Sequence, residues 1–188
     1  MAASALVGSR ASAHEYDTNR ERFNPQLVDS GLPYPAGEIH VFPDDFYLYL
    51  MQEDGVAMRY GVGVGRDGLY HDGKYTIGDM QEWPRWRPTD AMIARDPGSY
   101  ARYIDGIPGG VNNPLGARAL YLHDENGVDT YLRIHGTNAP STIGTAVSNG
   151  CARLTNEFIV DLYDRVSIGT PVTLHPKAGS AGIAAWHS

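Results

Sequence analysis

Short runs in which apolar side chains alternate with polar ones recur along most of this chain. They are rich in β-branched and aromatic residues, and Gly, Asp and Asn lie between them. Such runs are typical of β-strands, because successive side chains of a strand point to opposite faces of its sheet. The expected strands cover residues 39–42, 46–51, 57–64, 74–80, 119–123 and 130–135, and Asp54-Gly55 predicts a hairpin turn. The pattern favours a mainly β fold, with a sandwich or a barrel-like pair of sheets.

One segment near the C-terminus has helical periodicity instead. Over residues 156–166 apolar side chains recur three or four positions apart. Thr155 is a suitable N-cap, Glu157 lies in the first turn, and Asp161 is spaced to pair with Arg165. Gly169 and a proline follow, and residues 172–175 predict a final strand.

Residues 81–118 form a long stretch with little strand pattern. Connections of this length are usually functional or disordered, and the Trp and Tyr side chains here argue against disorder. We therefore expect a lid or cleft wall, with a short helix at residues 89–95. Its aromatic residues either contact a substrate or pack together as a satellite core: Trp83, Trp86, Tyr100 and Tyr103.

The composition is that of one globular domain. The chain has 188 residues, of which 42% are hydrophobic and 20% charged. A formal net charge of −7 argues against nucleic acid as a partner. A local group of arginines, Arg85, Arg87, Arg95 and Arg102, is read as a solvated loop. No apolar run is long enough to span a membrane.

The two ends of the chain are expected to lie outside the catalytic domain. Residues 1–32 are assigned to a flexible N-terminal tail, residues 33–176 to the domain, and residues 177–188 to a C-terminal tail. Ala11-Ser12-Ala13 has the small-x-small form of a signal-peptidase site, although no basic region precedes it. The N-terminal residues are either the remnant of a signal peptide or a flexible tail.

Cys151 is the only cysteine of the chain, and His135 lies upstream of it. A thiol beside an imidazole can perform acyl transfer, because the imidazole takes the thiol proton and the thiolate attacks a carbonyl carbon. A buried cysteine without chemistry is the alternative reading. Against it, Cys151 follows Ser148-Asn149-Gly150, a polar turn whose backbone N–H groups could form an oxyanion hole.

The alternation along residues 130–135 also places His135. Tyr131, Arg133 and His135 should share one face of the strand, and the aliphatic residues Leu132 and Ile134 the other. Since the aliphatic pair should face the core, we expect the His135 imidazole to face a cleft. A structural, hydrogen-bonded histidine is the alternative.

Neither a metal nor a cofactor is expected. The other six histidines are scattered, without the paired spacing of a zinc site. Gly61, Gly63 and Gly65 alternate within an expected strand, so they do not form a nucleotide-binding loop between a strand and a helix.

The motifs around Cys151 resemble those of the L,D-transpeptidase (YkuD-type) catalytic domain of bacterial cell-wall enzymes. The resemblance extends from about residue 39 to residue 175 and is carried, in order, by Gly61-Val62-Gly63-Val64-Gly65, Thr76-Ile77-Gly78, Trp83-Pro84-Arg85-Trp86-Arg87-Pro88-Thr89, Asn113-Pro114-Leu115-Gly116, His135-Gly136-Thr137, Ser148-Asn149-Gly150-Cys151-Ala152-Arg153, Leu162-Tyr163-Asp164-Arg165-Val166 and Gly169-Thr170-Pro171-Val172. It implies the L,D-transpeptidase β-sandwich or barrel-like fold, with one helix after the catalytic loop and a long lid loop.

The resemblance also implies roles for individual residues. Cys151 is the nucleophile, His135 the base, and the carbonyl of Gly136 orients the imidazole. The backbone N–H groups of Asn149, Gly150 and Cys151 form the oxyanion hole. Ser148 and Thr137 are expected to contact substrate, and Arg153 either binds a substrate carboxylate or pins its own loop. Asn149 stands where many members of the family have a second histidine, and Ala152 is smaller than the usual aliphatic residue.

The implied activity is that of an exported, periplasmic enzyme of peptidoglycan assembly and cell shape. Cys151 would attack a tetrapeptide stem, form a thioester, and pass the acyl group to an amine in a 3-3 cross-link. The expected partners are stem peptides and, through a covalent adduct, carbapenems. A carboxypeptidase, endopeptidase or D-amino-acid exchange enzyme with the same site, and a catalytically silent wall-binding module, are the alternatives.

Overall fold

The computed structural model describes residues 21–178, and their regular secondary structure is mainly β-strand. The segments of the signal-peptide hypothesis lie outside these residues. The strands are β1 (Gln26–Asp29), β2 (Ile39–Phe42), β3 (Tyr47–Met51), β4 (Val56–Gly61), β5 (Val64–Gly65), β6 (Gly73–Glu82), β7 (Arg118–His123), β8 (Asp129–His135), β9 (Ala146–Ser148), β10 (Ala152–Arg153) and β11 (Pro171–Leu174). The helices are α2 (Asp90–Arg95), α3 (Pro97–Tyr100) and α4 (Asn156–Tyr163), with 3-10 turns at Glu53–Gly55, Ala101–Tyr103 and Pro140–Thr142.

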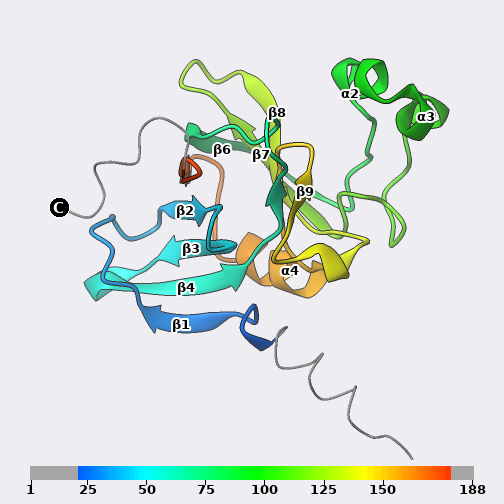
Figure 1. The fold of residues 1–188 in the computed structure, drawn as a ribbon. Coiled ribbons are helices and arrows are strands. Elements are labelled where there is room, and N and C mark those ends of the chain that lie inside the picture. The colour runs from blue at the N-terminus through cyan, green and yellow to red at the C-terminus, as the bar shows by residue number, and fades with distance from the viewer. Residues whose placement is uncertain (1–20, 179–188) are drawn as a thin grey trace, which may run out of the picture.

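Nine strands form one mixed sheet in the order β1-β4-β3-β2-β11-β6-β7-β8-β10. The long strand β6 pairs with β11 through its first half and with β7 through its second, and the register shifts between Ile77 and Asp79. This bulge bends β6, so the strands on its two sides form the two halves seen in Figure 1.

The ends of the sheet approach each other through Gly63. Its N–H donates to the Arg153 carbonyl at 2.9 Å, and Arg153 N–H returns a bond of 2.8 Å to the Gly63 carbonyl. Val64 then pairs with Ala146 in the small β5-β9 sheet. The sheet thereby curls into the expected barrel-like form, with an aliphatic core between its halves.

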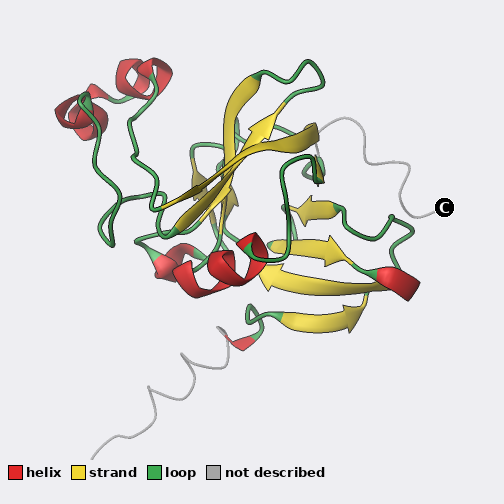
Figure 2. Ribbon diagram, turned by 180° about the vertical axis from the view of Figure 1, so that it is seen from behind, coloured by secondary structure: helices red, strands yellow, loops and turns green. Residues whose placement is uncertain are grey.

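Helix α4 closes one end of this core (Figure 2). Ile159 and Leu162 are fully buried, and the helix packs on β7 while Tyr60 Oη of β4 donates to Asp161 at 2.5 Å. The Thr155 hydroxyl accepts from Phe158 N–H, which confirms Thr155 as the N-cap. The helix ends at Tyr163, one turn earlier than the apolar pattern predicts. The pattern continues past this end because Val166 packs on the core from the following loop.

The structure places all six expected inner strands and the final strand, with two differences. The expected strand at residues 57–64 divides into β4 and β5, because after Gly61 the chain leaves β3 and pairs with β9 and β10. Residues 26–29, which the sequence assigned to the N-terminal tail, form edge strand β1 and pair with β4 in antiparallel register. Lys177, assigned to the C-terminal tail, donates to the Gly65 carbonyl at 2.9 Å.

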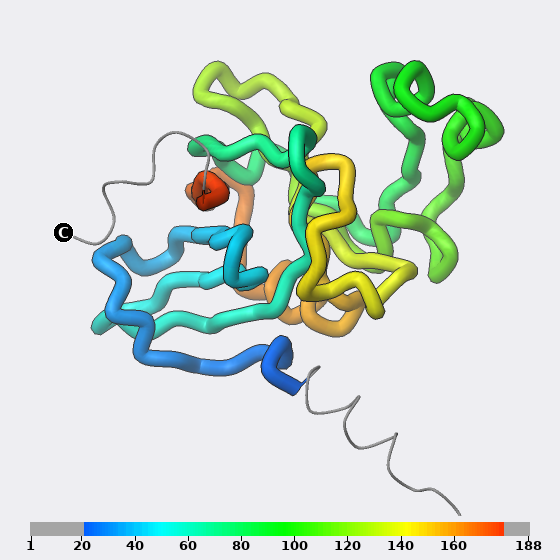
Figure 3. The backbone as a smooth tube through the Cα atoms, viewed as in Figure 1, coloured from blue at the N-terminus to red at the C-terminus, as the bar shows by residue number. Residues whose placement is uncertain are grey.

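Residues 83–117 form the lid, which stands away from the sheet (Figures 1 and 3). It contains α2 and α3, and Thr89 caps α2 as the expected short helix requires. Neither helix has a fully buried residue. The base of the lid is instead held by Asn113, whose amide donates to the carbonyls of Pro84, Ile107 and Pro108 and accepts from Leu115 N–H.

We expect Asn113→Ala to loosen the lid. The side chain is 1% exposed, so its removal leaves buried backbone groups without partners and should cost about 2 to 3 kcal/mol of local stability. Limited proteolysis within the lid, followed by mass spectrometry, measures this. Asn126→Ala in an exposed turn is the control, and equal cleavage rates for both variants would contradict the prediction.

Candidate functional site

Cys151 lies in the short turn between β9 and β10. Ser148 Oγ accepts from Gly150 N–H at 3.2 Å and donates to the Cys151 carbonyl at 2.7 Å, so one hydroxyl ties both ends of the turn. Gly150 has φ of 127°, a backbone conformation that residues with a Cβ rarely adopt. The turn therefore holds the half-buried thiol in a fixed position.

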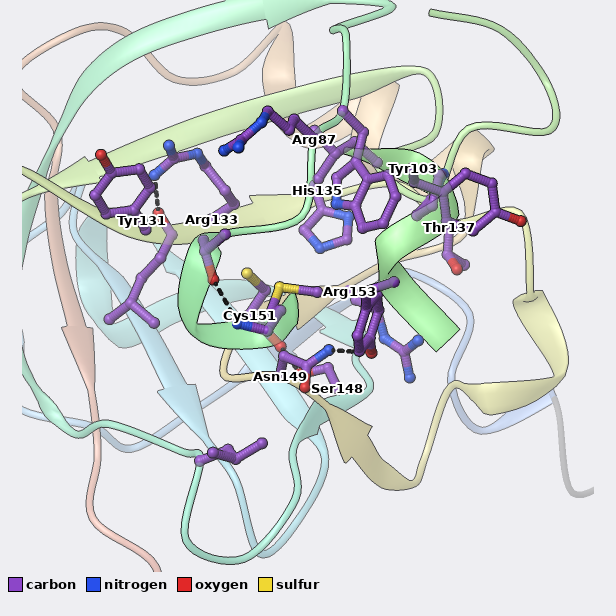
Figure 4. Close-up of a pocket in the computed structure, with 18 of the residues that line it drawn as sticks. Arg87, Tyr103, Tyr131, Arg133, His135, Thr137, Ser148, Asn149, Cys151 and Arg153 are labelled. Carbon is purple, nitrogen blue, oxygen red and sulfur yellow. Dashed lines mark hydrogen bonds between the residues drawn. The ribbon is translucent and has the colours of Figure 1, made fainter. Parts of the chain in front are cut away.

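His135 ends β8, the strand that pairs with β10 in parallel. In this register Ala152 lies opposite Ile134 and Arg153 opposite His135, which brings the Cys151 turn beside the end of β8. The backbone N–H of Arg133 hydrogen-bonds the Cys151 thiol. In Figure 4 the side chains of Cys151 and His135 lie in the same pocket.

The His135 ring is oriented by the next residue of the chain. Its Nδ1 lies 2.5 Å from the Gly136 carbonyl, and because a carbonyl only accepts, Nδ1 carries the proton. Nε2 is then left as the basic nitrogen. Gly136 is required for close packing, since a Cβ there would lie 2.4 Å from Asn156 Oδ1.

The wider pocket encloses about 700 Å³ and lies between the Cys151 turn and the lid. This volume is in the range of pockets that bind a small molecule or a peptide segment. Its floor is formed by β8 and the turn. One wall comes from the lid, through Trp86, Met92, Tyr100 and Tyr103.

A model of the L,D-transpeptidase catalytic domain matches residues 36–174 of the chain. The chain belongs to this L,D-transpeptidase family. It is 35% identical over 131 residues to the probable L,D-transpeptidase YcfS of Escherichia coli, with 68% of this chain and 40% of that protein covered. It therefore spans less than half the length of that relative.

Solved structures agree on the fold. A crystal structure from Brucella melitensis named as a probable carnitine operon oxidoreductase is 51% identical, with a TM-score of 0.56 and 79% of this chain and 91% of that one covered. The L,D-transpeptidase LdtMt1 in complex with imipenem has a TM-score of 0.51 at 14% identity, with 73% and 57% covered. The name of the Brucella protein differs, and the family assignment rests on the domain match.

In this L,D-transpeptidase domain the thiol of Cys151 and the imidazole of His135 are both uncharged at rest. Burial is the main influence on both groups: it raises the pKa of the Cys151 thiol and lowers the pKa of His135 to about 4. The Arg133 N–H and the charges of Arg133 and Arg153 act in the other direction on the thiol and favour the thiolate. A neutral imidazole beside a neutral thiol is thus the starting state.

This state predicts how the reactivity of Cys151 depends on pH. With a pKa above the ordinary range, the thiolate forms only as pH rises past that range, while His135 stays neutral throughout the neutral range. The rate of Cys151 alkylation by iodoacetamide should therefore keep rising into alkaline pH. The urea-unfolded protein should level off near the ordinary thiol pKa of about 8.5. A plateau at neutral pH in the folded protein would indicate a preformed thiolate–imidazolium pair instead.

Asn149 connects the catalytic turn to the lid. Its Oδ1 accepts from Arg95 of α2 at 2.9 Å, and its Nδ2 donates to Tyr100 Oη of α3 at 2.8 Å (Figure 4). The side chain that replaces the more usual histidine therefore holds both lid helices. Of the three N–H groups expected to form the oxyanion hole, that of Gly150 donates to Ser148 Oγ, and the hole itself stays a prediction.

The remaining predicted site residues all line the pocket. Thr137 is 3% exposed and its hydroxyl accepts from Ala139 N–H. Arg153 has buried Nε and Nη2 atoms with no hydrogen-bond partner among the described residues. Tyr131, Arg133 and His135, expected on one face, also line the pocket. Of the pair expected on the core face, Ile134 is fully buried, whereas Leu132 lines the pocket as well.

The sequence reading missed the position of the lid arginines. Arg85, Arg87 and Arg95 are exposed, as a solvated loop requires, yet all three line the pocket. Three of the four lid aromatic residues fit both expectations, because Trp86 packs against Tyr100 and Tyr103 and all three line the cavity. Trp83 is exposed and does not line it. The sequence signal that could have indicated this position is the recurrence of arginine within residues 83–89, a stretch that also contains two tryptophans.

No helix within residues 21–178 is long and apolar enough to cross a bilayer. Over the same range, no three His, Cys, Asp or Glu side chains are grouped as metal ligands would be.

Proposed function

We propose that the protein is a cysteine-dependent peptidoglycan L,D-transpeptidase that cross-links stem peptides. The observation that carries the proposal is the His135 ring, fixed by Gly136 at Nδ1 in the same pocket as Cys151. Membership of the family supports the substrate class. Such a substrate lies outside the cytoplasm, so the proposal includes export to the periplasm.

The reaction begins with proton transfer within the neutral pair. His135 Nε2 takes the Cys151 proton as Sγ attacks the carbonyl between the L-centre and the terminal D-residue of a tetrapeptide stem. The carbonyl π-electrons move to oxygen, where the backbone N–H groups of Asn149 and Cys151 receive the charge, joined by that of Gly150 once it leaves Ser148 Oγ. Each such donor is typically worth about 3 kcal/mol.

The tetrahedral intermediate then collapses to a thioester. The C–N bond breaks, and the leaving amine of the D-residue takes the proton back from His135. An amine of a second stem next attacks the thioester, gives its proton to His135, and expels the Cys151 thiolate, which is reprotonated. Ser148, Thr137 and Arg153 line the pocket. In this proposal the first two contact the bound stem and Arg153 contacts its carboxylate. Water as the acceptor would make the same site a carboxypeptidase.

The proposal also includes a covalent adduct with carbapenems. The solved relative in complex with imipenem supports it at the level of the family fold. The strained β-lactam carbonyl would take the place of the stem carbonyl and acylate Cys151.

The test is incubation of the purified protein with a disaccharide-tetrapeptide, followed by mass spectrometry of protein and products. A cross-linked dimer with release of the terminal D-residue supports a transpeptidase. Formation of the shortened monomer alone would show that the enzyme is a hydrolase and not a transpeptidase. No product and no imipenem adduct would overturn both and leave a silent wall-binding module.

A further inference from the structure

The pocket has a charge opposite to that of the whole chain. Its lining includes five arginines, Arg85, Arg87, Arg95, Arg133 and Arg153, and the histidines His71 and His135. The chain has a formal net charge of −7, yet no Asp or Glu of the described residues lines the pocket. Such a one-sided lining attracts anions and repels cations.

Two of these arginines are already neutralised by carboxylates. Arg133 forms two bonds with Asp129, at 2.6 and 2.8 Å, and Arg87 bonds Asp90 at 3.0 Å. Arg85, Arg95 and Arg153 form no ion pair within the described part of the chain. The partner of Arg95 is the neutral amide of Asn149. Three positive charges of the pocket are thus uncompensated.

Of the three, Arg153 has the greatest need of a hydrogen-bond partner. It lies two residues from the nucleophile, and its Nε and Nη2 are buried without a hydrogen-bond partner. A guanidinium has five N–H donors and is costly to leave unpaired out of water. Burial accordingly lowers the pKa of Arg153. A carboxylate is the group that matches a guanidinium in both charge and shape.

We propose that the pocket selects acyl donors with free carboxylates and discriminates against donors whose carboxylates are amidated. The inference rests on the proposed function. Arg153 acts close to the scissile bond, where the terminal D-residue carries a carboxylate. Arg85 and Arg95 act from the lid, on carboxylates further along the stem.

The expected loss of kcat/KM differs between Arg153 and Arg85. Loss of a buried, charge-assisted bond at Arg153 should lower kcat/KM for the free donor about tenfold or more. Arg85 is exposed and screened by water, so its loss should cost about two- to fivefold, mainly through KM. Raising the salt from about 0.1 to about 1 M should reduce the Arg85 effect more than the Arg153 effect, because screening acts mainly on exposed charges.

The experiment compares three tetrapeptide donors: one with free carboxylates, one with its side-chain carboxylates amidated, and one with the carboxylate of its terminal D-residue amidated. Release of the terminal D-residue is followed with the wild-type protein, Arg85→Gln and Arg153→Gln. Arg102→Gln is the matched control, since Arg102 belongs to the same lid but stacks on Tyr103 and does not line the pocket. Because Arg85 is exposed, its variant should fold even if Arg153→Gln does not.

We expect the wild type to prefer the free donor over both amidated donors. Arg85→Gln should lose the preference over the donor amidated on its side chains, Arg153→Gln should lose the preference over the donor amidated at its terminal residue, and Arg102→Gln should keep both. Equal kcat/KM for the three donors in the wild type, or intact preferences in Arg85→Gln and in folded Arg153→Gln, would overturn the inference while the proposed function stands. If the wild type uses none of the donors, the proposed function fails, and this inference fails with it.

Discussion

Replacement of Cys151 by alanine is expected to abolish both cross-link formation and the covalent imipenem adduct. No other side chain in the pocket combines a nucleophilic atom with the Arg133 N–H contact and the neighbouring basic imidazole. Loss of a covalent nucleophile removes the pathway and typically lowers turnover by several orders of magnitude, on the order of 10⁴-fold or more. Intact mass spectrometry of the variant with imipenem and with a tetrapeptide donor measures both.

The variant should remain folded, so a loss of activity can be attributed to the loss of the thiol. The thiol is half-buried in a turn, and the change removes one sulfur atom without creating a large cavity. Thermal unfolding checks this, and Cys151→Ser is the conservative companion variant. Product formation by folded Cys151→Ala at the wild-type rate would exclude Cys151 as the nucleophile.

Replacement of His135 by glutamine should slow acylation of Cys151 about 10²- to 10⁴-fold. A glutamine amide can donate to the Gly136 carbonyl as Nδ1 does, but it cannot take the thiol proton. The rate of imipenem acylation in single-turnover conditions isolates this step. His123→Gln, on the neighbouring strand β7 and outside the pocket, is the control.

The pH dependence separates a lost base from a damaged fold. At alkaline pH the thiolate forms without help, so His135→Gln should recover a large part of its acylation rate, whereas a misfolded protein would not. An unchanged acylation rate at neutral pH would show that another group acts as the base. A deficit that is the same at every pH would point to a structural role for His135.

Local patterns in the sequence predicted most of the sheet. Residues 39–42 and 119–123 alternate in the expected way and form β2 and β7. Edge strand β1 was missed because neither of its faces is buried, so residues 26–29 carry no strong apolar alternation: their side chains are exposed or half-buried. Strands β9 and β10 have only three and two residues, too few for any period to be read.

The residues of the proposed catalytic group could be named from the sequence because they lie close along the chain. His135 and Gly136 are neighbours, and Cys151 follows in a polar turn. The bonds of Asn149 with Arg95 and Tyr100 join residues about fifty positions apart. Such contacts depend on how the lid folds back, which no local pattern encodes. The same reason hid the pocket-facing position of Arg85.

The lid helices, without a fully buried residue and fixed mainly through Asn113 and Asn149, define a cooperative unit of their own. Units of this kind open at a free energy well below that of global unfolding. In hydrogen exchange the amides of α2 and α3 should therefore report lid opening, while those of β7 and β8 report loss of the sheet. A ligand that bridges the lid and the Cys151 turn must dissociate before the lid opens, so it would slow exchange in α2 and α3 by the factor 1 + [L]/Kd. The lid amides thus offer a direct affinity measurement that requires neither turnover nor global unfolding.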